Sequence, residues 1–235
     1  MVNKVAIFIQ ARLFSTRLKG KILFSFFNQT IIDRIIKISK RVKFKKKIYI
    51  LSGNYKKNFF LKKYALINNV NIFFGDEDNV LKRFQNLIYK EKLQDYYILR
   101  LTSDNYLAQP KILDHVIKEG LKKKYDYCYI KPLSHFAGEL IKATTLLKEK
   151  GKTEDIKNHV TLGIRKNKKI KKLVLGNNTM NIDHTKYFTL DTIDDLMIMK
   201  VLEDKYPSLT KLDNLKTLKK VQKENKNFKK FILNL

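Results

Sequence analysis

Two hydrophobic periods alternate along the chain from its first residues. Short apolar runs bounded by polar residues are typical of strands buried within a sheet. Val5 to Ile9 is such a run, and another ends at the turn signal Ser52-Gly53-Asn54. The pattern predicts strands at residues 5–9, 47–52, 70–74, 96–101, 126–131, 171–175 and 187–190.

Between these runs, apolar residues recur at the spacing of amphipathic helices. Thr30 stands before isoleucines at helical spacing and is a candidate N-cap, Pro110 suits the first turn of a helix, and Thr192 is another candidate cap. The acidic residues 76–78 suit the positive end of a helix dipole better than a metal site. The predicted helices cover residues 29–41, 56–67, 75–92, 110–120, 139–150, 154–165, 192–205 and a final leucine-rich stretch from 208 to 221.

The order strand, helix, strand, helix predicts an α/β protein. Its sheet should be mixed but mostly parallel, with helices on both faces. No linker or internal repeat divides the 235 residues, so we expect a single domain over residues 1–235, with the irregular stretch at about 132–180 as an inserted lobe.

Charge is the most conspicuous feature of the composition. Fifty Lys+Arg against 22 Asp+Glu give a net charge of +28, which would suit a nucleic-acid binder. The excess, however, is mostly lysine spread over the whole chain, together with many Phe and Tyr and no Trp, as AT-rich codon usage produces. We therefore expect anionic small-molecule substrates and no nucleic-acid partner.

The apolar runs and the cysteine content indicate where in the cell the protein is located. No apolar run is long enough to span a membrane, and the run at 5–9 is too short for the core of a signal peptide. Cys128 is the only cysteine, which excludes an intrachain disulfide and suits a reducing compartment. We expect a cytoplasmic protein without a membrane partner.

A basic loop directly after the first predicted strand is the leading candidate for a site. It carries Arg12, Ser15, Arg17 and Lys21, together with further cationic and hydroxyl side chains. Arginine binds phosphate oxygens through a bidentate fork, and loops at the carboxyl ends of strands bind ligands in open α/β sheets. The loop lacks the spacing of a P-loop or a dinucleotide fingerprint, so a phosphate or nucleotide site and a plain basic loop both stay open.

Two aspartates follow predicted strands and should reach the same edge of the sheet. Asp104 comes after the strand at 96–101, and Asp191 after the strand at 187–190. Two carboxylates beside a polyphosphate suit Mg²⁺, although either residue alone could be a turn or cap residue. The four histidines show no zinc-ligand spacing and no nucleophile motif is present, which favours a reaction driven by positioning and electrostatics.

Five segments in order carry a family resemblance. They are IQARLFSTRLKGKIL, GDEDNVLKRF, ILRLTSDNYLAQPKILDHVI, KNHVTLGIRKN and FTLDTIDDL. Together they resemble the cytidylyltransferase family of CMP-sugar synthetases, closest to the branch of spore coat polysaccharide biosynthesis protein F. The resemblance implies a Rossmann-like nucleotide-diphospho-sugar transferase fold, CTP as a substrate, transfer of CMP to an acidic sugar or related acid with release of pyrophosphate, and a role in cell-surface polysaccharide biosynthesis.

The resemblance also assigns residues. It implies that Arg12 and Lys21 hold the triphosphate and act in catalysis, that Asp104 acts with them, and that Asp104 and Asp191 hold Mg²⁺. His159 becomes a contact to the sugar. The remaining positions expected to contribute to nucleotide binding are Ala11, Ser15, Arg17, Ser52, Arg83 and Arg100.

Some positions depart from the family pattern. Phe14 stands where the phosphate loop has a small glycine, and Lys19, Ser103 and Tyr106 replace proline, glycine and proline. A Phe14 side chain turned out of the site would leave the loop accessible to phosphates. By resemblance we expect a homodimer formed through the inserted lobe, which should also set acceptor specificity. A sugar-phosphate nucleotidyltransferase with another nucleotide and a non-catalytic homologue are the alternatives.

Overall fold

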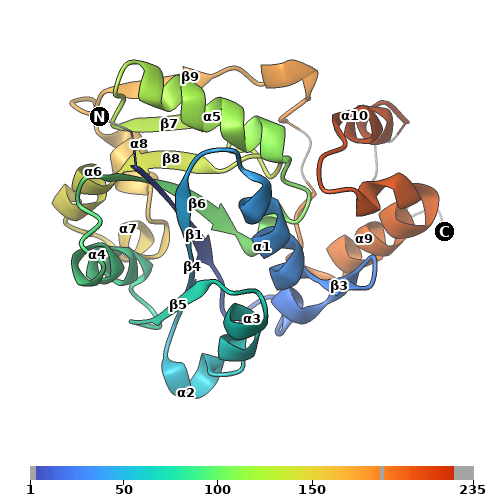
Figure 1. The fold of residues 1–235 in the computed structure, drawn as a ribbon, viewed down its shortest axis with the longest axis horizontal. Helices are drawn as coiled ribbons and strands as arrows, with labels where there is room; N and C mark the ends of the chain where they lie inside the picture. Colours follow the sequence, from blue (N-terminus) through green and yellow to red (C-terminus); the bar gives the residue numbers. More distant parts are fainter. Residues whose placement is uncertain (1–3, 186–187, 225–235) are drawn as a thin grey trace.

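A seven-stranded sheet organises the structure, a computed structural model that describes residues 4–185 and 188–224 (Figure 1). The strand order is β5-β4-β1-β6-β8-β7-β9, and β8 runs antiparallel to both of its neighbours. The strands are β1 (Lys4–Gln10), β4 (Lys46–Ser52), β5 (Asn71–Phe74), β6 (Tyr96–Thr102), β7 (Tyr127–Ile130), β8 (Glu139–Lys142) and β9 (Lys172–Leu175). The mostly parallel sheet predicted from the sequence is confirmed.

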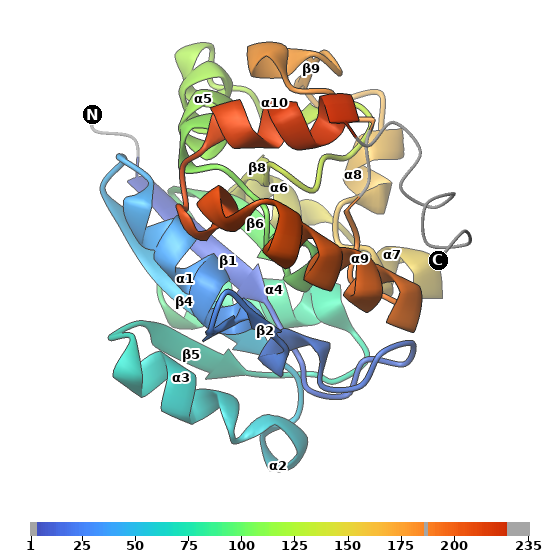
Figure 2. The ribbon, with the colours of Figure 1, turned by 90° about the vertical axis from the view of Figure 1, so that its right-hand side faces the viewer.

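Helices cover both faces of this sheet, and each face has its own apolar core. One core is built with α1 (Ile31–Arg41), α3 (Leu61–Ile67), α5 (Pro110–Lys122), α9 (Ile193–Lys205) and α10 (Leu215–Glu224). The other is built with α4 (Val80–Lys90), α6 (Ala143–Lys148), α7 (Glu154–Asn158) and α8 (Leu162–Lys166). In Figure 2, which is turned by 90°, α9 and α10 lie at the front, facing the viewer.

The remaining elements are short. They are the helix α2 (Tyr55–Asn58), the strands β2 (Ser25–Phe26) and β3 (Gln29–Thr30), and the 3-10 helices η1 (Lys21–Leu23), η2 (Ser103–Asn105), η3 (Thr179–Asn181) and η4 (Pro207–Thr210). No helix within the described residues is long and apolar enough to cross a membrane.

Local capping signals in the sequence are confirmed. The Thr30 hydroxyl accepts a hydrogen bond from the Asp33 backbone N–H at the start of α1. Thr192 caps α9 in the same way, and Pro110 is the first residue of α5. These signals depend only on residues within one turn, so they could be read without knowing the tertiary structure.

The helix predicted at 139–150 is wrong in its first third, because those residues form β8. Leu140 and Ile141 are buried on opposite faces of the sheet, between the ladders of β6 and β7. A short apolar run bordering a helix has no period of its own, so its pairing partners decide the structure.

Other boundaries also differ. The helix predicted at 154–165 is interrupted between α7 and α8, the one at 56–67 is divided into α2 and α3, and the one at 75–92 begins only at Val80. The last helix begins at Leu215 and not near 208. Residues 188–190 form no strand, because Phe188 and Leu190 are buried in the core without joining a ladder, and Tyr187 lies outside the described residues.

One buried cation ties α1 to two distant segments. Arg34 is 1% exposed; its Nε donates to the Tyr106 carbonyl at 2.7 Å and its Nη2 donates to the Leu209 carbonyl at 2.6 Å. Burial lowers the pKa of Arg34 to about 10, which still leaves the guanidinium protonated at neutral pH. Arg34 therefore holds the segment that follows β6 against α1 and η4.

Replacing Arg34 with methionine should destabilise the protein by about 2–4 kcal/mol, because the buried carbonyls lose a charged donor. Urea unfolding followed by circular dichroism measures this free energy. Arg41→Met, on the exposed end of α1, is the matched control and should change it by less than about 0.5 kcal/mol. Equal effects of the two substitutions would contradict the assignment.

Candidate active site

The basic loop after β1 is closed upon itself. Gly20 N–H donates to the Leu13 carbonyl at 2.7 Å, so residues 13–20 form a compact excursion between β1 and η1. Gly20 has φ +71°, a conformation that suits a residue without Cβ. This closure determines where Lys21, the next residue, enters the site.

The base of the loop is held by a buried asparagine. Asn58, at the end of α2, is fully buried, and its Oδ1 accepts from Leu13 N–H at 2.9 Å. Its Nδ2 donates to the Asn54 carbonyl and, at 3.2 Å, to the Glu77 carboxylate. Glu77 also accepts from Asn54 N–H at 2.6 Å. The segments after β4 and β5 thus support the loop that follows β1.

Lys21 joins the basic loop to both predicted metal ligands. Its Nζ lies 2.8 Å from Asp104 Oδ1 and 2.6 Å from Asp191 Oδ1, and its side chain is only 9% exposed. Arg17 Nη2 lies 2.7 Å from the other carboxylate oxygen of Asp191. Four of the residues chosen from the sequence therefore meet at one place, although their segments are far apart along the chain.

The position of Asp191 is set by the start of α9. The Asp195 carboxylate accepts from the backbone N–H groups of Asp191 at 2.8 Å and Thr192 at 3.1 Å. Burial acts to raise the pKa of the Asp191 carboxyl, but hydrogen bonds and charges from Lys21 and Arg17 hold this pKa below its ordinary value. Asp191 is therefore a carboxylate at neutral pH.

The donor set at this place suits a hard divalent cation. The carboxylates of Asp104 and Asp191 already turn to one cationic atom, the Lys21 ammonium. The described part of the chain contains no group of three or more His, Cys, Asp or Glu side chains that could hold a metal. Two carboxylates leave coordination positions for water and phosphate oxygens, which is how Mg²⁺ is commonly held beside a nucleotide.

Arg83, chosen from the sequence, lies close to Arg12 of the basic loop. Arg83, on α4, is 1% exposed and donates through Nε and Nη2 to the Asp76 carbonyl and through Nη2 to the Glu77 carbonyl. Burial lowers the pKa of Arg83, and the nearby charge of Arg12 lowers it further. Arg83 thus braces the turn that carries Glu77, and the half-buried Arg12 lies within its electrostatic reach.

Asp76 and Asn79 shape the turn before α4. Asp76 accepts from the backbone N–H groups of Asp78 and Asn79, and Asn79 caps the helix by accepting from Lys82 N–H. The acidic residues therefore form a turn ahead of the helix and do not occupy its first turn.

The small residues expected at the site, Ala11, Ser15 and Ser52, differ in how deeply they are buried. Ala11 is buried and its N–H donates to the Leu51 carbonyl at 3.0 Å, while Ser15 is half-buried in the loop. Ser52 is fully buried at the end of β4, and its hydroxyl has no hydrogen-bond partner in the described part of the chain. Phe14 is 52% exposed, so its side chain is turned to solvent and leaves the loop accessible.

A pocket of about 180 Å³ opens beside Asp104. We call it the acceptor-side pocket and define it by the lining residues Arg100, Asp104, His135, Glu139, His159 and Arg165. His159 and Arg100, both chosen from the sequence, are in its wall. Arg12, Lys21 and Asp191 do not line it. The site thus has a cationic loop on one side of Asp104 and this pocket on the other.

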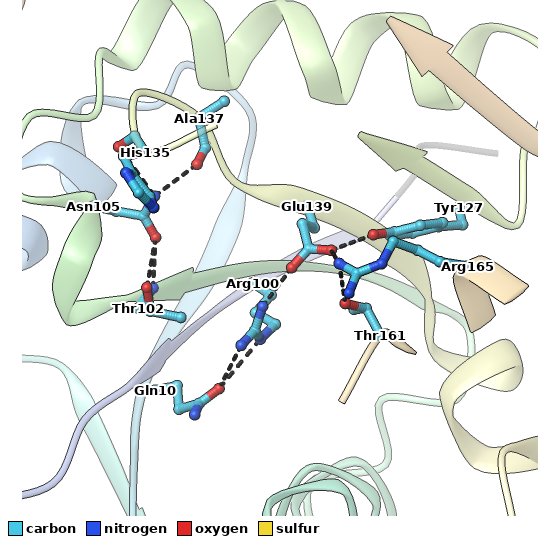
Figure 3. A network of polar contacts seen from close by, with 10 residues as sticks. All are labelled: Gln10, Arg100, Thr102, Asn105, Tyr127, His135, Ala137, Glu139, Thr161 and Arg165. Carbon is cyan, nitrogen blue, oxygen red and sulfur yellow. Dashed lines mark hydrogen bonds and ion pairs between the residues drawn. The ribbon is translucent and has the colours of Figure 1, made fainter. Parts of the chain in front are cut away.

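The segment that roofs the pocket is fastened by Asn105 (Figure 3). Asn105 Nδ2 donates to the carbonyls of His135 and Ala137, and its Oδ1 accepts from Thr102 N–H at 2.7 Å. Burial lowers the pKa of the His135 imidazole despite the nearby carboxylates of Asp104 and Asp191. His135 is therefore neutral at pH 7.

A charged network forms the opposite wall (Figure 3). Glu139, the first residue of β8, is ion-paired with Arg100 and, at 3.5 Å, with Arg165, and it accepts a hydrogen bond from the Tyr127 hydroxyl. Burial acts to raise the pKa of the Glu139 carboxyl, but Arg100, Tyr127, Arg165 and Thr161 lower it below its ordinary value. Glu139 is therefore ionised within the fold.

Several of these residues were not chosen from the sequence. Asn58, Glu77, Asn105, Glu139 and Arg165 act through contacts between segments far apart in the chain. Glu139 and Arg165 fell within stretches predicted to be helical, where a charged residue is expected to be solvated. Asp195 could have been found, because it stands three residues after the cap Thr192, as in a capping box.

Comparison with known proteins decides the family. The family model described as Cytidylyltransferase matches residues 6–230 of the chain. The chain belongs to the cytidylyltransferase family. The family suggested by the five sequence segments is therefore confirmed, and the protein is a nucleotidyltransferase that uses CTP.

Individual relatives agree with this assignment. The chain is 28% identical over 214 residues to the spore coat polysaccharide biosynthesis protein SpsF of Bacillus subtilis, covering 87% of this chain and 88% of that protein. A solved cytidylyltransferase from Leptospira borgpetersenii has a TM-score of 0.81 at 24% identity, covering 96% of each chain.

The fold is shared more widely. A solved CMP:2-keto-3-deoxy-manno-octonic acid synthetase, determined in complex with CTP, has a TM-score of 0.62 at 12% identity and covers 86% of this chain and 99% of that chain. The predicted nucleotide-diphospho-sugar transferase fold is confirmed.

Substituting Asn58 with alanine should loosen the basic loop and raise the KM for CTP. The change removes the acceptor of Leu13 N–H and one of the two donors to the Glu77 carboxylate, at a cost of about 1–3 kcal/mol. Steady-state kinetics and urea unfolding measure the two effects. Asn177→Ala, at an exposed position, is the control; an unchanged KM for CTP in Asn58→Ala would refute the supporting role.

Proposed function

We propose that this cytidylyltransferase transfers CMP from CTP to a hydroxyl of an acidic sugar or a related acid, with release of pyrophosphate. The observation that carries the proposal is the meeting of Lys21, Asp104 and Asp191 between the basic loop and the acceptor-side pocket. The likeness to SpsF over most of both chains supports a role in making a cell-surface polysaccharide.

The basic loop would bind the triphosphate. Arg12 and Arg17 bring guanidinium groups to this side of the site, and Lys21 brings an ammonium group to its centre. Fixed cations there would neutralise the charge that develops on the leaving pyrophosphate, and they would do so without reorganising during the reaction. Ser15 and the backbone beside the exposed Phe14 would add hydrogen bonds to phosphate oxygens.

Asp104 and Asp191 would hold Mg²⁺ beside the triphosphate. The chemistry that a bound Mg²⁺ supplies is polarisation of phosphate oxygens and a greater acidity of a coordinated hydroxyl. The protein fixes both carboxylates beforehand, Asp191 through Asp195 and Asp104 through the short helix η2 at the end of β6.

The acceptor would lie in the acceptor-side pocket with its reacting hydroxyl toward Asp104. Attack of that oxygen on the α-phosphorus forms one P–O bond, breaks the bond to pyrophosphate and releases the hydroxyl proton. Asn105 keeps the segment of His135 over the pocket, and His159 stands in its wall as a contact to the sugar. Positioning two reactants in this way supplies much of the rate enhancement in such transfers.

Substituting Asp104 or Asp191 with alanine should lower the rate of pyrophosphate release by about 10²–10³-fold or more, because each change removes a charge that acts at the reacting phosphate. A coupled pyrophosphate assay across a panel of sugar acids measures the rate, and EDTA should abolish it in the unsubstituted enzyme. Asp204→Ala, exposed on α9, should leave the rate unchanged. Full activity of Asp104→Ala would sink the metal assignment.

Among CTP, UTP, GTP and ATP, CTP with Mg²⁺ should raise the melting temperature most, because a ligand that binds only the folded state stabilises it more, at equal concentration, the lower its Kd. Differential scanning fluorimetry at equal concentrations measures the shift. Equal or larger stabilisation by another nucleotide would contradict the preference for CTP.

We also propose that the protein forms a homodimer through residues 132–180 and is located in the cytoplasm.

A further inference from the structure

The two arginines that line the acceptor-side pocket are used differently. Arg100 donates through Nε and Nη2 to Gln10 Oε1 at 3.2 and 3.0 Å, and its Nη1 pairs with Glu139. All three nitrogens of Arg100 are therefore engaged by protein atoms. Its side chain is only 14% exposed, so Arg100 acts as part of the wall.

Only one of the three side-chain nitrogens of Arg165 contacts other protein side chains. Its hydrogen bond to Thr161 Oγ1, at 3.2 Å, and its ion pair with Glu139, at 3.5 Å, both use Nη1. Within residues 4–185 and 188–224, no protein atom accepts a hydrogen bond from Nη2 or Nε of Arg165. The side chain is 22% exposed and lines the pocket, so these donors can reach a ligand.

The charge balance of the network points the same way. Glu139 is one buried carboxylate shared by two guanidinium groups, Arg100 and Arg165. One positive charge therefore remains uncompensated in the wall of the pocket. A cation withdrawn from water gains from an anionic partner with matching geometry, and a carboxylate fits the fork of an arginine.

We propose that Arg165 binds the carboxylate of the acceptor and selects acidic over neutral acceptors. Glu139 and Thr161 hold Nη1, which leaves the Nη2 and Nε side of the guanidinium directed to the ligand. This assignment rests on the proposed function, because it places the acceptor in the acceptor-side pocket. Lys21, which pairs with Asp104 and Asp191, and Arg17, which pairs with Asp191, remain with the triphosphate.

The test uses the full-length protein with three sugar acids as probes, namely 3-deoxy-manno-octulosonate, N-acetylneuraminate and glucuronate. Each is paired with its methyl ester, which keeps the shape and removes the charge. Titration calorimetry without CTP measures acid binding, and the coupled pyrophosphate assay measures transfer. Wild-type enzyme, Arg165→Gln, Arg165→Lys and the exposed control Arg41→Gln are compared.

At least one acid should bind the wild-type enzyme and lose about 10- to 100-fold in affinity in Arg165→Gln, the effect expected for a lost charged hydrogen bond. Its ester should bind weakly to both proteins. Arg165→Lys should recover part of the affinity, the KM for CTP should stay constant, and Arg41→Gln should behave as wild type. A far-UV circular dichroism melt confirms that each variant is folded.

The outcomes separate this inference from the proposed function. Acid binding that is equal in wild type and Arg165→Gln, or absent from both, overturns the role of Arg165, even if CMP is transferred to another acceptor. Binding that depends on Arg165, without pyrophosphate release from CTP, supports the role of Arg165 and contradicts the proposed transfer.

Discussion

The ammonium group of Lys21 is the point on which the site depends. It joins three segments that are separated by 83 and 170 residues along the chain, and in the unfolded protein these segments have no reason to meet. Two carboxylates brought this close repel each other unless a cation lies between them. The remaining contacts each hold one of the three segments: Asn58 the basic loop, Asn105 the end of β6 and Asp195 the start of α9.

The sheet places the two halves of the site on either side of β6. Toward β1 and β4 lie the cationic basic loop, which the bond from Gly20 N–H to the Leu13 carbonyl closes, and the acidic turn with Glu77, whose carboxylate accepts from Asn54 N–H. Toward β8 lies the acceptor-side pocket, whose wall is a shared ion pair. Asp104 lies between the two halves, because it pairs with Lys21 and also lines the acceptor-side pocket.

The sequence predicted the parts of this arrangement that depend on local chemistry. Buried strands, the threonine caps and the placement of Lys21 and Asp104 after parallel strands follow from short-range patterns or from parallel topology. Asp191 reaches the same place, although residues 188–190 before it form no strand. The strand β8 could not be predicted, because its structure is decided by two neighbours distant in sequence. Glu139 and Arg165 were missed for the same reason: a charge is read as solvated until the strand that buries it is known.

The antiparallel direction of β8 has a consequence for how acceptor choice can change. Because β8 runs against its neighbours, its first residue, Glu139, pairs with Arg100 near the end of β6, and the next two residues, Leu140 and Ile141, pair with strands on both sides. One side of the acceptor-side pocket is therefore formed by side chains on paired strands, those of Arg100, Tyr129 and Glu139. Under the proposed function, substituting individual side chains on these strands would change the acceptor while the basic loop keeps its backbone.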